Sequence, residues 1–176
     1  LEALKKEKNS DYYFASKFAL YSGLRNGELF GLTWEDIDFD KKTIRINKQF
    51  NKSINKITTT KTRKSTREIP LFKNLEEITK EIITERGSVA KKELLFKNMN
   101  GATYGVMIER IALKNGLKSI TPHMFRHTFA SNCLVKGINP KTIQKWLGHS
   151  ELDMTMNVYV DVLNELEASD INKYND

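Results

Sequence analysis

Short strand-forming segments near residues 43–71, set among helical patterns, most restrict the fold of this chain. Thr43–Ile46 alternates polar and apolar residues, which favours a strand, and residues 54–60 and 67–71 predict two more. Pro70 places the last strand at an edge of the sheet or ends it. Three short strands form only a thin antiparallel sheet with one buried face, so helices must cover it.

Helix-forming patterns lie on both sides of this predicted sheet. Phe14, Phe18 and Tyr21 recur at near-helical spacing in residues 11–21, and we expect these side chains in the core. A shorter helix is predicted over residues 26–32, followed by a turn that leads into the sheet. Prolines at first-turn positions and glycines after the last turn indicate later helices. These are predicted over residues 74–86, 103–115, 122–136, 140–147, 153–159 and 162–168.

The length and composition are typical of one globular domain. The chain has 176 residues and 39% hydrophobic side chains, enough for a core. It has no secretory signal and no apolar run near the roughly 20 residues of a membrane span. The lone Cys133 excludes an internal disulfide, and we expect a buried thiol in a reducing cytoplasm. The predicted fold is α+β: residues 1–176 form one mostly helical domain with a small three-stranded antiparallel sheet.

Positive charge gathers in the predicted strand region. Ten basic residues and no acidic residue lie between residues 41 and 67, so the rest is net negative although the chain carries +7. A local basic patch of this kind is expected of a nucleic-acid contact. The alternative is a solvated basic hairpin without a partner. The ten residues are Lys41, Lys42, Arg45, Lys48, Lys52, Lys56, Lys61, Arg63, Lys64 and Arg67.

The last third of the chain carries polar groups suited to gripping a phosphodiester. His123 and Arg126 are three residues apart on a predicted helix, so their Cβ atoms lie about 5–6 Å apart on one face. Arginine offers phosphate a two-pronged donor, and histidine offers a donor or a proton carrier. His149, in a Leu-Gly-His-Ser segment, and Tyr159 follow. Taken alone, His123 and Arg126 are more often a plain surface pair.

Two upstream segments add cations that fit the same chemistry. Arg25 lies between two glycines at a corner between predicted helices, where a phosphate can approach closely, and Glu28 can hold its guanidinium. Lys61 lies near a predicted hairpin tip, from which a flexible ammonium can protonate a leaving oxygen. The alternative for Arg25 and Glu28 is an ordinary surface pair. The alternative for Lys61 is a phosphate contact without proton transfer.

Other residues indicate packing roles, and several kinds of site are missing from the sequence. We expect structural roles for Trp146 and for His127, which points about 100° away from Arg126 on its helix. The sequence has no carboxylate cluster suited to Mg²⁺, no Cys/His spacing for zinc and no phosphate-binding glycine loop. We therefore predict that the chain uses no metal or nucleotide cofactor.

In their order and spacing, these segments resemble the catalytic domain of the phage-integrase family of tyrosine recombinases, over about residues 11–160. The residues around Tyr159 are most similar to integrases of phages and conjugative elements from Gram-positive bacteria. The resemblance implies that Tyr159 is the nucleophile. It also implies that Arg25 and Arg126 clamp the scissile phosphate.

The resemblance implies roles for the remaining polar residues as well. His123 matches the general acid/base, Lys61 the acid for the 5′-oxygen, and His149 the last phosphate contact. Glu28 matches a supporting acidic residue. Basic residues in and after the predicted hairpin would contact or support the DNA without reading its sequence. These are Lys48, Lys52, Lys56, Arg63 and Lys64.

The implied activity is site-specific DNA recombination by transesterification, through a 3′-phosphotyrosyl link and a free 5′-hydroxyl, without metal or ATP. Family members act as tetramers on double-stranded DNA at paired sites, and accessory DNA-bending or excision factors are expected partners. Because the chain starts at Leu1, we expect a fragment that lacks the family's N-terminal DNA-binding domain. Alone, such a fragment is expected to be monomeric, in the cytoplasm of a bacterial host and away from membranes.

Other functions remain open on the sequence. A type IB topoisomerase or a chromosome-resolving recombinase would use the same chemistry, although the Arg25 corner and the short hairpin favour recombinases. A DNA-binding regulator would keep this fold without cutting DNA. A generic basic helical protein is the most distant alternative.

Overall fold

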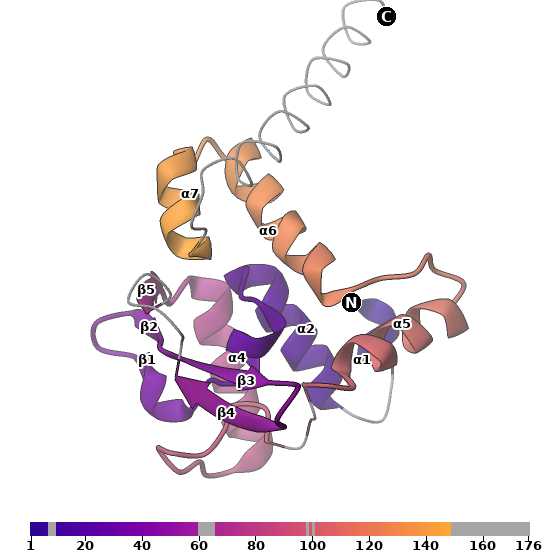
Figure 1. Cartoon of the computed structure of the whole chain (residues 1–176), viewed down its shortest axis with the longest axis horizontal. Helices are drawn as coiled ribbons and strands as arrows, with labels where there is room; N and C mark the ends of the chain where they lie inside the picture. Colours follow the sequence, from indigo (N-terminus) through magenta and orange to yellow (C-terminus); the bar gives the residue numbers. More distant parts are fainter. Residues whose placement is uncertain (7–9, 60–65, 98, 100, 149–176) are drawn as a thin grey trace, which may run out of the picture.

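A computed structural model of the chain describes residues 1–6, 10–59, 66–97, 99 and 101–148. Its helices are α1 (Glu2–Lys5), α2 (Ser10–Ser22), α3 (Asn26–Leu29), α4 (Lys73–Arg86), α5 (Tyr104–Lys114), α6 (Pro122–Val135) and α7 (Pro140–Leu147). A 3-10 turn, η1, spans Trp34–Asp36. The strands are β1 (Ile37–Asp38), β2 (Thr43–Ile46), β3 (Lys48–Asn51), β4 (Lys56–Thr59) and β5 (Arg67–Pro70). In Figure 1, α6 and α7 lie together at the top, and α1 and α5 lie at the right.

Helix α2 runs through the main core. Phe14 and Phe18 are buried, as predicted, and Tyr21 packs against the core while remaining partly exposed. The Phe18 ring meets the Phe96 ring edge-on, with centroids 5.9 Å apart. Helix α2 contacts α4, α6, α1 and α3, so it is covered on several sides. Because α2 is central, its packing fixes the position of the corner between α2 and α3.

The strands form two separate antiparallel units. The larger sheet has the order β1-β2-β5, so the predicted three-stranded sheet is confirmed, with Pro70 in an edge strand. Its membership differs from the prediction, because residues 37–38 supply the third strand and residues 54–60 do not. Instead, β4 pairs only with β3, in a local hairpin whose turn holds Asn55 at a φ of 50°. A strand of two residues is too short to show an alternating pattern.

A second apolar cluster joins α6 to α7. Cys133 belongs to it and is 6% exposed, which confirms the expected buried thiol, and burial raises its pKa to about 11. Gly23, at a φ of 64°, lies so close to the Phe129 ring that no side chain would fit there. This glycine lets the end of α2 approach the cluster. The buried members are Phe129, Ala130, Cys133, Ile143 and Leu147.

The helix predictions agree closely with the structure. Helices α2, α4, α5, α6 and α7 begin and end within one residue of their predicted bounds. Helix α3 is shorter than predicted, because Gly31 N bonds to Glu28 O and the chain tightens out of the helix. The helices predicted over residues 153–159 and 162–168 lie outside the described residues. Within the described part, no helix has both the length and the apolar character to cross a membrane.

Candidate active site

The corner between α2 and α3 places Arg25 directly before the first turn of α3. The Arg25 backbone N–H donates to Glu28 Oε2 at 2.9 Å, and Arg25 Nη1 donates to Oε1 at 3.1 Å. The buried Glu28 carboxylate therefore caps the helix and holds the guanidinium. The expected contact between Arg25 and Glu28 is confirmed. The Arg25 side chain remains 42% exposed, whereas the Glu28 side chain is buried, so solvent reaches this pair from the arginine side.

A second arginine, Arg67, reaches the same carboxylate from strand β5. Its Nη1 and Nη2 donate to the two Glu28 oxygens at 2.8 and 3.0 Å, and both side chains are buried. From the sequence, Arg67 counted only as a member of the basic run. The sequence did carry a signal that Arg67 is buried: side chains alternate along a strand, which puts Arg67 on the same inward face of β5 as Ile69. A cation on an inward face requires a buried partner.

Glu28→Gln is expected to destabilise the chain, because it leaves Arg67 buried without a counter-charge. Removing one partner of a buried ion pair costs about 3–5 kcal/mol, which urea unfolding at pH 7 would measure. Burial by itself would raise the pKa of Glu28, but the hydrogen bonds and charges of Arg67 and Arg25 outweigh burial and lower it. The stabilisation by the carboxylate is therefore full above its ordinary pKa and lost as the pH falls through the lowered one.

The matched control for this change is Glu77→Gln, at an exposed position of α4. A surface substitution of this kind usually changes stability by less than about 0.5 kcal/mol. A Glu28→Gln variant that is as stable as Glu77→Gln at pH 7 would contradict the expected role of the carboxylate.

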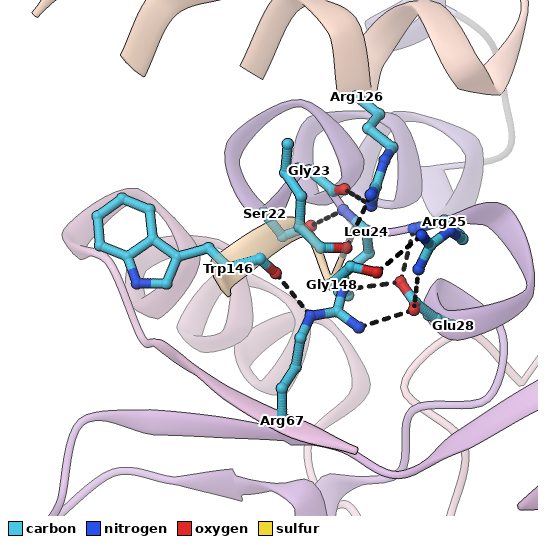
Figure 2. Close-up of polar contacts among 10 residues, drawn as sticks. Ser22, Gly23, Leu24, Arg25, Glu28, Arg67, Arg126, Trp146 and Gly148 are labelled. Atoms are coloured by element: carbon cyan, nitrogen blue, oxygen red, sulfur yellow. Dashed lines mark hydrogen bonds and ion pairs between the residues drawn. The ribbon is translucent and has the colours of Figure 1, made fainter. Parts of the chain in front are cut away.

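The C-terminus of α7 presents three successive backbone carbonyls to three arginines (Figure 2). The bonds run from Arg67 Nε to Trp146 O (2.6 Å), from Arg126 Nη2 to Leu147 O (2.7 Å) and from Arg25 Nη2 to Gly148 O (2.9 Å). Carbonyls at a helix C-terminus lack intrahelical partners and carry partial negative charge, so cations suit them. Helix α7 is thereby fixed to α3, α6 and β5 at once. The Trp146 ring packs edge-on against Phe72, as expected of a packing residue.

Arg126 lies on the buried face of α6 and is only 3% exposed. Besides Leu147 O, its guanidinium bonds to Gly23 O, at 2.7 Å from Nη1. Its Nε is buried and has no hydrogen-bond partner among the described residues. Burial and the charge of Arg25 lower the pKa of Arg126, and the charge of Glu28 opposes this change. Arg126 therefore lies where α6 meets the end of α2 and the end of α7.

His123 lies one turn before Arg126 on α6 and is exposed. Its ring meets the His127 ring edge-on, with centroids 4.5 Å apart. His127, expected to pack or bond structurally, is exposed and packs on His123. Partial desolvation of the ring lowers the pKa of His123, and the charges of His127, Arg126 and Arg25 lower it further. The structure thus brings His123 into electrostatic reach of both candidate clamp arginines.

We expect His123 to titrate below the ordinary histidine pKa of about 6.5, so that its imidazole is neutral at pH 7. The folded chain takes up this proton less readily than the unfolded chain, so stability falls as the pH drops below the ordinary value. NMR titration of the three histidines measures the pKa directly. His127→Gln removes a like charge and should raise the pKa of His123. Titration of His123 at or above the ordinary value in the unaltered chain would contradict this prediction.

The structure divides the basic run into paired and unpaired cations. Lys52 and Lys56, at the β3–β4 hairpin, are exposed and have no ion pair to a described residue. Lys48 is only 20% exposed and also bonds to Thr33 Oγ1. The charge available to a polyanion is therefore smaller than the sequence suggests. The paired members are Lys41 with Asp38, Lys42 with Glu76, Arg45 with Asp36, Lys48 with Asp36 and Glu35, and Arg67 with Glu28.

Several candidate residues lie outside the described part of the chain. These are Lys61, Arg63, Lys64, His149 and Tyr159. His149 directly follows Gly148, whose carbonyl bonds to Arg25. Among the candidates that are described, Arg25, Glu28, His123 and Arg126 lie together. In the same part of the chain, no three His, Cys, Asp or Glu side chains converge as a metal site would require.

Comparison with known proteins gives matches along most of the chain. The model of the family described as "Phage integrase family" matches residues 1–165. The transposase of transposon Tn916 from Enterococcus faecalis is 28% identical, over 89% of this chain and 44% of that protein. A tyrosine recombinase of Pseudothermotoga lettingae is 32% identical, over 94% of this chain and 54% of that protein. The chain thus spans about half the length of the curated relatives it matches.

Solved structures share the fold. The integrase of transposon Tn1549, in complex with transposon right end DNA, matches with a TM-score of 0.75 and 30% identity. This match covers 94% of the present chain and 61% of the integrase chain. XerA recombinase matches with a TM-score of 0.71 at 24% identity, over 96% of this chain and 58% of that one. The second likeness concerns the fold alone.

Proposed function

The chain belongs to the phage integrase family, and we propose that it is the catalytic domain of a site-specific DNA recombinase from a mobile element. The relatives support this proposal, because they include a transposase, a tyrosine recombinase and an integrase solved with DNA. The chain spans only part of these relatives, so the partners of the whole protein are also part of the proposal. They are double-stranded DNA at specific sites, three further copies in a tetramer, and accessory DNA-bending or excision factors, in a bacterial cytoplasm.

The proposed reaction exchanges one phosphodiester bond for another. The Tyr159 phenol oxygen bonds to the scissile phosphorus, and the bond from phosphorus to the 5′-oxygen breaks. The phenol gives up its proton, and the 5′-oxygen takes one up. A free phenol has a pKa of about 10, so it requires a proton acceptor and nearby cations to attack at neutral pH. Because the phosphotyrosine link is itself a diester, rejoining needs no ATP.

The other candidate residues take roles around the phosphate. We assign phosphate clamping to Arg25 and Arg126, which offset the charge that builds on the oxygens. His123 acts in proton transfer at the attacking or leaving oxygen. Lys61 protonates the 5′-oxygen, and His149 contacts the phosphate. Glu28 supports Arg25.

One observation carries the proposal: Arg25 and Arg126 converge at the end of α7, beside His123, and both keep unused donors. A guanidinium has five N–H groups. Arg25 bonds through Nη1 and Nη2 and stays 42% exposed. Arg126 has a buried Nε without a hydrogen-bond partner in the described part of the chain. Two neighbouring cations, with spare donors open to solvent on Arg25, suit an incoming phosphate better than a closed structural network.

The test is to trap the covalent product. The chain is mixed with nicked duplexes of randomised sequence. After cleavage the short strand diffuses away, and its loss prevents rejoining. Adducts that resist SDS are digested and analysed by mass spectrometry. We expect the nucleotide on the peptide that contains Tyr159, one of six tyrosines in the chain. The absence of an adduct, or an adduct at another residue, would overturn the proposal.

The same assay separates the alternative functions. A DNA-binding regulator would bind the duplexes without forming an adduct. A recombinase would exchange strands between two differently labelled duplexes that carry the trapped sequence. A topoisomerase would form the adduct and relax supercoiled DNA without exchange. Relaxation alone would overturn the recombinase assignment.

We expect Lys52 and Lys56 to contribute salt-sensitive, sequence-independent affinity for DNA. Each lost phosphate contact should lower the slope of log K against log salt by about one. Fluorescence anisotropy with a duplex of arbitrary sequence, at several salt concentrations, measures the slope for a Lys52→Ala/Lys56→Ala variant. The sequence groups Lys48 with them as a source of this affinity, but in the structure its ammonium pairs with Asp36, so Lys48→Ala is the control. An unchanged slope in the double variant would contradict the prediction.

A further inference from the structure

Arg67 joins two parts of the site that come from distant segments of the chain, and we propose that it is a positioning residue for DNA cleavage. On one side it holds Glu28, which in turn holds Arg25. On the other side it holds the last turn of α7, which leads to His149. This one side chain sets the spacing between the clamp arginine and the end of α7. The inference rests on the proposed function.

Each nitrogen of the Arg67 guanidinium has a partner. Nη1 and Nη2 bond in parallel to the Glu28 carboxylate at 2.8 and 3.0 Å, which fixes the guanidinium plane. Nε bonds to Trp146 O at 2.6 Å, which fixes α7 relative to that plane (Figure 2). The side chain is only 6% exposed, so water has little access to replace these bonds.

Gly148 packs directly on the same guanidinium. At its φ of 65°, an added Cβ would lie 2.8 Å from Arg67 Nη1 and 2.9 Å from Cζ. Gly148 O accepts a bond from Arg25 Nη2 at 2.9 Å. The backbone just before His149 is thus held between two arginines. A shift of Arg67 would move this backbone, and a misplacement of about 1 Å in a reacting site can cost about 100-fold in rate.

Arg86 makes a similar set of contacts in another part of the fold. Its Nη2 bonds to Asp11 Oδ1 and its Nη1 to Leu95 O, both at 2.7 Å. Both charged side chains are largely buried. Arg86 therefore also joins a carboxylate to a backbone carbonyl, but it ties the end of α4 to α2 and holds no proposed site residue. Comparing the two arginines separates a general loss of packing from a loss of site geometry.

The test compares Arg67→Lys with Arg86→Lys. Lysine keeps the charge, but its single nitrogen does not reproduce a planar three-nitrogen contact. The single-turnover cleavage rate is measured on a nicked duplex that carries the sequence identified by the adduct assay. The temperature is one at which circular dichroism shows each variant folded. DNA affinity is measured in parallel. We expect the rate of Arg67→Lys to fall by about 100-fold with its Kd nearly unchanged, and Arg86→Lys to cleave at the rate of the unaltered chain.

Gly148→Ala gives a second variant, which keeps Arg67 but pushes its guanidinium aside. It should likewise lose cleavage and keep DNA affinity. Unchanged cleavage in Arg67→Lys, or equal losses in Arg67→Lys and Arg86→Lys, would overturn the positioning role. If Arg67→Lys fails to fold, unchanged cleavage in Gly148→Ala would overturn it. If the unaltered chain forms no adduct at all, the proposed function fails, and this inference fails with it.

Discussion

Tyr159→Phe is expected to abolish the covalent protein–DNA adduct and to leave DNA binding intact. Phenylalanine keeps the ring but lacks the oxygen that would bond to phosphorus, and cations at a phosphate cannot replace a missing nucleophile. DNA affinity arises chiefly from cations at the phosphates, so the loss of one neutral hydroxyl should change it little. A labelled nicked duplex, analysed by SDS gel for the adduct and by gel shift for binding, measures both quantities.

Tyr174→Phe is the matched control, because Tyr174 is the other tyrosine after residue 148. It should form as much adduct as the unaltered chain. If Tyr174→Phe loses the adduct and Tyr159→Phe keeps it, the nucleophile is Tyr174 and the assignment to Tyr159 is wrong. If both variants keep the adduct, neither tyrosine is the nucleophile.

Arg126→Ala is expected to lower the cleavage rate about 100- to 1,000-fold, the effect of removing one strong donor from a charged transition state. Its effect on DNA affinity should be far smaller, because Arg126 is 3% exposed and the proposed clamping role involves a single phosphate. Single-turnover cleavage and gel shift on the same duplex separate the two effects. Equal losses in both measurements would contradict a clamping role.

The same substitution also affects stability, so it needs a folding control. Arg126 bonds to Gly23 O and Leu147 O, and its removal deprives both buried carbonyls of this donor. A buried carbonyl left without a partner costs about 1–3 kcal/mol. Arg86→Ala removes a comparable buried arginine at another place in the fold. It should therefore shift the unfolding midpoint in the same direction while cleavage per folded molecule stays unchanged.

The helices were predictable because their ends carry local signals. Asn139 caps α7 through its side chain, which accepts a bond from Lys141 N at 2.9 Å, and Pro140 follows in the first turn. Gly148 ends the same helix in the left-handed region. The contact between Arg25 and Glu28 was also predictable, since three residues of helical spacing bring these side chains together.

The non-local contacts of the site could not be read from neighbouring residues. Arg67 meets Glu28 and Trp146 only after a strand, two helices and their connections have packed. The two-residue strand β1 exists because β2 offers it a partner, not because its own sequence alternates. The pairing of Lys48 with Asp36 likewise depends on how η1 lies against the sheet. In each case, the determining partner lies in another element and is selected by packing.

The burial of Cys133 makes the chain suitable for site-specific labelling. Maleimide-type reagents react with thiolates, and a buried thiol with a pKa of about 11 is almost fully protonated at neutral pH. No other cysteine competes with an introduced one. Ser53→Cys would place an exposed, nearly isosteric thiol on the β3–β4 hairpin. A fluorophore there would report the approach of DNA in real time, with every native cation still in place.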